Sequence, residues 1–186
     1  MIGAVLAGGT GSRFGRASKP AALLAGRPLA SYPVEALREL CDRVVVVCKR
    51  GTELPALNGA ERWNEPDEPR HPLAGIVHAL EHADGGPVLV CAADMPFVTA
   101  DACRSLLAAP QKALAVVAAA DGVLQPTFGV YAPQALEILR AAPPNARLTD
   151  TVEQLDPTRV AFPMRLVRSV NTPEELEEAE RLLAAA

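Results

Sequence analysis

Aromatic residues and positive charge are both scarce in this sequence. Aromatic side chains make up 4% of the chain, and the formal net charge is −4. Proteins that bind long nucleic acids usually present basic patches together with rings on which bases stack. These two shortages therefore argue against a nucleic-acid surface, and we expect no nucleic-acid partner.

Long apolar segments are missing as well. The longest apolar run, 113–120, lies between Lys112 and Asp121 and is much shorter than the roughly 18 residues of a membrane span. The chain begins at Met1 and passes directly into an apolar run ending at Leu6, without the basic region or cleavage site of a secretory signal. We therefore expect a cytoplasmic protein that does not contact a membrane.

The cysteines lack the spacing of a metal or redox motif. None of the four forms a C-x-x-C pair: they are Cys41, Cys48, Cys91 and Cys103. Two of them lie in or beside predicted strands. We expect them to act as small core hydrophobes in a reducing compartment, and we do not expect covalent catalysis by a cysteine.

What the sequence does contain is a regular alternation of strand and helix patterns. Continuous apolar runs are typical of strands that are buried on both faces in a parallel sheet; they occupy 2–6, 44–47, 88–91, 114–118, 128–131 and 166–170. Helical spacing of apolar residues fills the gaps between these runs. With 186 residues, one domain is the default. The sequence predicts an α/β fold in a single domain, 1–186, with a mostly parallel sheet covered by helices.

Two local signals refine this fold. Thr172, Pro173 and Glu175 form the start of a final helix, with an N-cap, a proline at the first position and a capping-box partner. Asp121-Gly122 predicts a tight turn, so one antiparallel pair interrupts the parallel pattern. Ligands of such sheets bind beyond the carboxyl ends of the strands.

A glycine-rich segment follows the first predicted strand. It runs from Leu6 to Gly15, and Lys19 comes shortly after it. Glycines let successive backbone N–H groups converge on phosphate oxygens, and Arg13 and Lys19 add positive charge. The alternative is a structural turn, but no carboxylate precedes Glu35. A local cationic lobe on an acidic protein favours a small phosphorylated ligand.

A carboxylate follows the strand predicted at 88–91. Asp94 at the carboxyl edge of a central strand is a candidate ligand for Mg²⁺, which proteins usually hold with one or two carboxylates; a turn or capping role is the alternative. Asn171 follows the last predicted strand and is a second candidate at the same edge, unless it caps the final helix. The segment 71–75 turns into a helix, whose start could bind an anion or could be an ordinary turn.

His78 and His82 are one helical turn apart, which is a spacing that can bind zinc. The sequence offers no evident third ligand, and Glu81 and Asp84 lie beside them. A solvated helix face is the favoured interpretation, and we do not predict zinc here.

Taken together, the motifs resemble the molybdenum cofactor guanylyltransferase family, in order and over nearly the whole chain. The matching blocks are Leu6-Ala7-Gly8-Gly9, Arg13-Phe14-Gly15, Lys19-Pro20, Gly26-Arg27-Pro28-Leu29, His71-Pro72-Leu73-Ala74-Gly75, Asp94-Met95-Pro96, Gln125-Pro126-Thr127 and Val170-Asn171-Thr172-Pro173-Glu174-Glu175-Leu176. The glycine-rich start alone is shared with sugar-phosphate nucleotidyltransferases, whereas the ordered set is specific.

The resemblance implies a Rossmann-like domain that moves GMP from GTP onto the phosphate of molybdopterin and releases pyrophosphate. It implies a site with Mg as cofactor, in which Leu6, Ala7, Gly8, Gly9 and Lys19 hold the nucleotide and Asp94 holds magnesium. Combined with the residue positions considered from the sequence, the candidate site is as follows: catalytic Arg13, Lys19 and Asp94; nucleotide-binding Leu6, Ala7, Gly8, Gly9, Lys19, Asn64 and Asp94; and metal-binding Asp94 and Asn171. GTP and molybdopterin are the implied substrates, and maturation proteins of molybdoenzymes are possible transient partners.

The chain departs from the family pattern at a few positions. Val47 stands where an asparagine is frequent at the end of the second strand, and Asn64 takes the ungapped position of a usually acidic residue, with Glu65 and Asp67 nearby. His71 replaces a glycine. The alternatives are a related nucleotidyltransferase that uses CTP or a sugar phosphate, or a nucleotide-binding protein without transfer activity.

Overall fold

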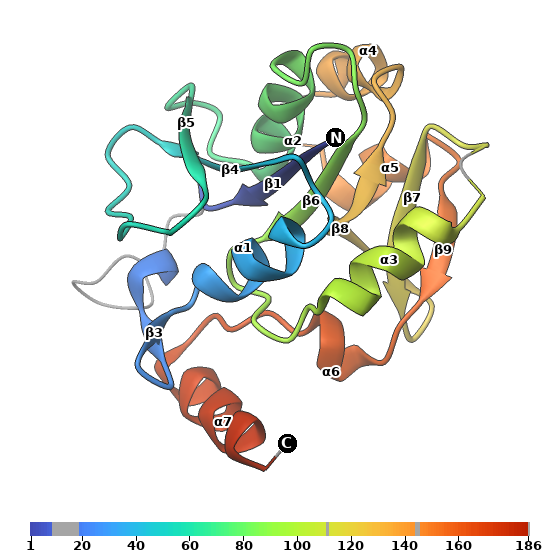
Figure 1. Cartoon of the computed structure of the whole chain (residues 1–186). Helices are drawn as coiled ribbons and strands as arrows, with labels where there is room; N and C mark the ends of the chain where they lie inside the picture. The colour runs from blue at the N-terminus through green and yellow to red at the C-terminus, as the bar shows by residue number, and fades with distance from the viewer. Residues whose placement is uncertain (9–18, 111, 144–145, 186) are drawn as a thin grey trace.

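The architecture is a mixed sheet between two layers of helices (Figure 1). The computed structural model describes residues 1–8, 19–110, 112–143 and 146–185. Within these ranges, one sheet has seven strands in the order β5-β4-β1-β6-β8-β7-β9. Their bounds are β1 Ile2–Leu6, β4 Arg43–Lys49, β5 Glu61–Glu65, β6 Val88–Ala92, β7 Ala115–Ala120, β8 Val123–Tyr131 and β9 Thr158–Ala161.

Most neighbouring strands in this sheet are parallel. β4, β5 and β6 all follow the direction of β1, while β8 runs antiparallel to both β6 and β7. Asp121 and Gly122, which connect β7 to β8, have φ of 49° and 79°, as a tight hairpin turn requires. The predicted α/β fold and the antiparallel pair of β7 and β8 are confirmed, and β8 forms a second antiparallel pair, with β6, that was not predicted.

Helices cover both faces of the sheet and bury a separate apolar cluster on each. The elements on one face are α1 (Ser31–Arg38), α3 (Ala100–Ala108) and α6 (Met164–Val167); those on the other are α2 (Pro72–Glu81), α4 (Ala135–Ala141) and α5 (Leu148–Glu153). Leu37 of α1 and Ile76 of α2 are fully buried, and each such side chain contributes roughly 1.5–3 kcal/mol of hydrophobic stabilisation. All five residues of β1 and of β6 are buried, which is why their sequences are continuous apolar runs.

The C-terminal helix packs apart from these two layers. α7 (Pro173–Ala184) lies beside a small hairpin of β2 (Leu23–Leu24) and β3 (Arg27–Pro28), where Leu24, Leu29, Val170 and Ala179 form a third cluster (Figure 1). Thr172 Oγ1 accepts a hydrogen bond from the backbone N–H of Glu175 at 3.2 Å, so the predicted N-cap is confirmed. The Glu175 carboxylate in turn accepts the backbone N–H of Asn171 at 2.5 Å.

The sequence misplaced one strand and missed two strands of the seven-stranded sheet, besides the small β2–β3 hairpin. The strand predicted at 166–170 is wrong, because 164–167 form α6, and Val167 is buried as part of that short helix. The strands that were missed, β5 and β9, lie at the two edges of the sheet. Edge strands are half exposed, so β5 reads Glu-Arg-Trp-Asn-Glu and β9 alternates in burial, and neither carries a continuous apolar run.

The chain order of the strands places a crevice beside β1. The chain passes from β1 through α1 to β4 on one side, and later from β5 through α2 to β6 on the other. Such a reversal leaves room for a ligand beyond the carboxyl ends of the two diverging strands, here after Leu6 and Ala92. In the part of the chain that the structure describes, no helix is both long and apolar enough to cross a membrane.

Candidate active site

Three polar side chains from distant parts of the chain meet at this crevice. Lys19 opens the short 3-10 helix η2 (Lys19–Ala21), and its ammonium forms an ion pair with Asp94 Oδ2. The same Nζ donates a hydrogen bond to Asn171 Oδ1 at 2.7 Å. The Asp94 carbonyl accepts the backbone N–H of Val170 at 2.8 Å, which fixes the 170–171 segment beside the end of β6. The structure therefore brings together the predicted residues Lys19, Asp94 and Asn171.

Asp94 has an oxygen that can accept a further ligand. Its Oδ1 is buried and has no hydrogen-bond partner among the described residues. Burying a carboxylate oxygen without a partner is costly, so such an atom suits a site that binds a cation or a donor. Asn171 Oδ1 supplies a second oxygen close by. These oxygen donors fit a magnesium ion.

Two adjoining pockets surround this cluster. The larger has a volume of about 260 Å³ and is lined by Leu6, Gly8, Glu65, Arg70, His71, Pro72, Gly75, Ala92, Asp94, Thr127 and Ser169. The smaller, of about 50 Å³, is lined by Leu6, Ala7, Lys19, Pro20, Ala93 and Asp94. Because Leu6 and Asp94 border both, a single ligand could reach from the larger pocket to the Lys19 ammonium.

Glu65, which lines the larger pocket, belongs to a buried ion pair. Lys49 ends β4 and Glu65 ends β5, and their Nζ and Oε1 atoms are 3.4 Å apart. Lys49 also donates to the carbonyls of Pro66 and Pro69, at 2.6 and 2.9 Å. Glu65 Oε2 is buried and has no hydrogen-bond partner within the described ranges. Burial raises the pKa of the Glu65 carboxyl, although the nearby Lys49 opposes the shift.

Two glycines allow the chain to pass closely around this carboxylate. A Cβ on Gly8 would lie 2.1 Å from Glu65 Oε1, so no side chain fits there without moving Glu65. A Cβ on Gly75 would lie 3.0 Å from Leu6 Cδ2, which shows how tightly α2 approaches β1. His71 caps α2 by accepting the backbone N–H of Leu73 at Nδ1, 3.2 Å away. The first turn of α2 therefore borders the pocket.

The cysteines provide no nucleophile. All four are free thiols, and Cys48, Cys91 and Cys103 are buried, as predicted for core residues. Burial raises the pKa of Cys103 to about 12 and that of Cys91 well above its usual range. Both thiols therefore stay protonated at neutral pH, whereas nucleophilic cysteine chemistry requires a thiolate.

Comparison with known proteins identifies the family. Residues 3–159 match the family model described as a MobA-like NTP transferase domain. The chain belongs to this family. It is 32% identical to a molybdenum cofactor guanylyltransferase of Cereibacter sphaeroides, covering 98% of this chain and 97% of that protein. It is 33% identical to a probable molybdenum cofactor guanylyltransferase of Deinococcus radiodurans, with coverages of 96% and 93%.

Solved structures agree with this assignment. The molybdopterin-guanine dinucleotide biosynthesis protein A of Archaeoglobus fulgidus superposes with a TM-score of 0.76 at 25% identity, over 100% of both chains. A 2-C-methyl-D-erythritol 4-phosphate cytidylyltransferase of Thermus thermophilus superposes with a TM-score of 0.74 at 22% identity, covering 98% of each chain. The second likeness concerns the fold alone.

Not every site residue predicted for this MobA-like chain falls in the pockets. Gly9 and Arg13 lie outside the described residues. Asn64 is exposed on β5, and its Oδ1 accepts a hydrogen bond from Arg62 Nε at 2.9 Å. Because successive side chains of a strand point to opposite faces, Glu65, and not Asn64, faces the larger pocket. The position of Glu65 shortly before the 71–75 block could have indicated this role. Without a predicted strand at 61–65, however, nothing in the sequence decides which side chain faces the pocket.

Proposed function

We propose that this protein is a magnesium-dependent nucleotidyltransferase that transfers GMP from GTP to the terminal phosphate of molybdopterin. The observation that carries the proposal is the meeting of Lys19, Asp94 and Asn171 beyond β1 and β6. This meeting occurs in a chain related over nearly its full length to molybdenum cofactor guanylyltransferases. The product would then pass to molybdoenzyme maturation proteins by transient contact.

The reaction depends more on aligning the reacting groups and stabilising negative charge than on acid–base catalysis. A phosphate oxygen of the acceptor forms a bond to the α-phosphorus of GTP, while the bond from that phosphorus to pyrophosphate breaks and its electron pair leaves with pyrophosphate. The attacking phosphate is already ionised near neutral pH, so no general base is required. Donors fixed around the developing charge then supply most of the rate enhancement.

Each member of the cluster has a role in this scheme. The Lys19 ammonium would leave Asp94 and bind oxygens of the triphosphate through charge-assisted hydrogen bonds. Asp94 and Asn171 would hold magnesium through their side-chain oxygens, and the ion would neutralise charge on the triphosphate. Lys19 and Asp94 neutralise each other in the structure, so the charged groups that would bind the triphosphate and the cation already lie side by side.

Glu65 supports guanine as the base. A carboxylate can accept two neighbouring donors, and guanine presents an N1–H beside an exocyclic N–H₂ group. Adenine and cytosine each present a ring acceptor at the corresponding place, which a carboxylate oxygen repels. Glu65 Oε2 is a buried acceptor in the larger pocket without a hydrogen-bond partner among the described residues, as is Asp94 Oδ1. A site with such a group rejects a base that cannot pair with it.

Pyrophosphate release tests the proposal and its rivals. The purified protein is incubated with Mg²⁺ and GTP, CTP or ATP, with either molybdopterin or glucose 1-phosphate as acceptor. We expect the fastest release with GTP and molybdopterin. Preference for CTP or for glucose 1-phosphate would move the protein to another nucleotidyltransferase class. GTP binding without release, with fresh molybdopterin present, would indicate a nucleotide-binding protein that performs no transfer.

A further inference from the structure

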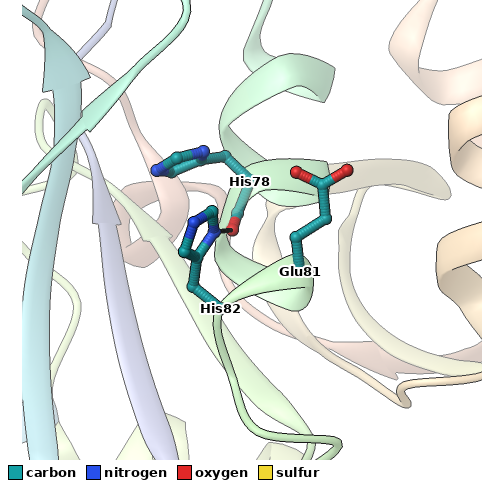
Figure 2. A group of neighbouring side chains, drawn as sticks. All are labelled: His78, Glu81 and His82. Carbon is teal, nitrogen blue, oxygen red and sulfur yellow. Dashed lines mark hydrogen bonds between the residues drawn. The ribbon is translucent and has the colours of Figure 1, made fainter.

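The C-terminal turn of α2 carries a cluster of three potential metal ligands. His78, Glu81 and His82 each offer one ligand atom, and these atoms all lie within 4.8 Å of one another (Figure 2). The histidine spacing can bind zinc, but the sequence favoured a solvated helix face, because no third ligand was evident and Glu81 and Asp84 lie beside the histidines. The structure places Glu81 on the same turn and so supplies that ligand.

The two imidazoles are held in place by their surroundings. His82 Nδ1 is 2.8 Å from the backbone carbonyl of His78. A carbonyl can only accept, so Nδ1 carries the proton and Nε2 keeps its lone pair. Metal-binding histidines commonly donate their second ring N–H to a carbonyl or carboxylate in this way. The hydrogen bond therefore selects the tautomer that a metal needs.

Trp63 of β5 orders both rings further. Its ring centroid lies 6.3 Å from that of His78, in an edge-on arrangement, and 5.6 Å from that of His82. The two imidazole centroids are 4.2 Å apart. Because these contacts order the imidazole rings when the protein folds, metal binding has less side-chain entropy to remove.

We propose that His78, His82 and Glu81 form a binding site for a divalent first-row transition metal, separate from the Asp94 site. Two imidazole nitrogens and one carboxylate suit Ni²⁺, Cu²⁺ or Zn²⁺, whereas Mg²⁺ prefers oxygen ligands. Glu81 Oε1 accepts a hydrogen bond from the Arg140 guanidinium at 2.8 Å, so the metal has to share or displace this contact. Bound metal would fix the end of a helix whose first turn borders the larger pocket.

Ni²⁺ titration of the full-length protein in magnesium-free buffer tests this site. Trp63 is the one tryptophan in the sequence, so its fluorescence reports on Ni²⁺ beside the two rings. We expect saturable quenching in the wild type. His82→Gln should weaken Ni²⁺ binding by roughly tenfold or more. Removing a group that only hydrogen-bonds to a metal ligand already costs about tenfold in metal affinity, and removing the ligand itself should cost at least as much. Glu81→Gln should weaken it by a smaller factor.

The third histidine of the chain provides the matched control. His71→Asn retains an oxygen acceptor for the cap of α2 and should leave the Ni²⁺ affinity unchanged. His82 is exposed, so its substitution should preserve the circular dichroism spectrum and Mg²⁺-supported pyrophosphate release, and the outcome does not depend on the proposed transfer activity. The absence of saturable quenching in the wild type, or equal Ni²⁺ affinities in wild type and His82→Gln, would overturn the proposal. Equal affinities in wild type and Glu81→Gln would overturn the assignment of the third ligand.

Discussion

Replacing Lys19 by methionine should change the affinities for nucleotide and for metal in opposite directions. Methionine approximates the length of the lysine stem and removes the charge. The side chains of Lys19 and Asp94 are only 16% and 21% exposed, so their ion pair is partly shielded from solvent. In the wild type, the ammonium both compensates the Asp94 carboxylate and, as we propose, binds the triphosphate.

The magnitude of the nucleotide effect follows from one lost charged contact. Hydrogen bonds to charged groups contribute about 1.5–3 kcal/mol, and each 1.4 kcal/mol corresponds to tenfold in affinity. GTP binding in Lys19→Met should therefore weaken by about 10- to 150-fold. Meanwhile Asp94 loses its cationic partner, and Oδ1 and Oδ2 are both left to attract a cation. Mn²⁺ in the absence of nucleotide should therefore bind more tightly than in the wild type.

Calorimetry measures both affinities on the same samples. Titrations of GTP and of Mn²⁺ are run separately on wild type, Lys19→Met and Lys112→Met. The last variant is the matched control, because Lys112 is exposed and lines neither pocket at the site. Unchanged GTP affinity in Lys19→Met would refute the role assigned to this ammonium. Mn²⁺ affinity that is unchanged or weaker would show that Lys19 does not compete with a metal for Asp94.

Three further substitutions test other parts of the site. Asp94→Asn conserves side-chain size and should lower kcat by about a hundredfold or more. Its melting temperature should stay close to that of the wild type. Near wild-type turnover at ordinary Mg²⁺ concentrations would exclude Asp94 as the metal ligand. Gly8→Ala adds a methyl group that would collide with Glu65 Oε1, so calorimetry should show GTP affinity reduced by roughly tenfold, and an unchanged affinity would disprove the close approach. Because burial raises the pKa of Glu65, the folded state binds its proton more tightly than the unfolded state, and ionised Glu65 costs stability as the pH rises through its folded pKa. Denaturant titrations between about pH 4 and pH 8 should therefore show that the free energy of unfolding of Glu65→Gln increases relative to that of the wild type as the pH rises. A difference that does not vary with pH would contradict this. The variant should also lose the preference for GTP over CTP.

The parts of the fold that follow from burial could be predicted from the sequence. β1 and β6 are buried on both faces, so their continuous apolar runs indicated both the strands and their place in a mostly parallel sheet. The position of Asp94 at the end of β6 could be predicted because a lone carboxylate follows a buried apolar run. Asn171 was expected at the same edge for a partly wrong reason. The strand predicted just before it is absent, because 164–167 form α6, and the hydrogen bond from the Val170 N–H to the Asp94 carbonyl holds the segment there.

Glu65 shows why the remainder of the site could not be predicted. It ends an edge strand whose five residues are mostly polar, so nothing in the periodicity marked β5. Whether Asn64 or Glu65 faces the pocket depends on the strand register, and a shift of one residue exchanges the two faces. The link between Gly8 and Glu65 is likewise a tertiary contact across 57 positions of sequence (65 − 8 = 57). Local sequence patterns carry no information about it.

The central claim is that this chain builds a guanine dinucleotide from GTP and molybdopterin, and mass spectrometry of the reaction mixture tests it most directly. Purified protein, Mg²⁺, GTP and molybdopterin are incubated together, and the dinucleotide product and pyrophosphate are quantified. We predict one pyrophosphate released for each dinucleotide formed, with both lost in Asp94→Asn. Pyrophosphate release without dinucleotide, or no product from folded protein that binds both substrates, would contradict the claim.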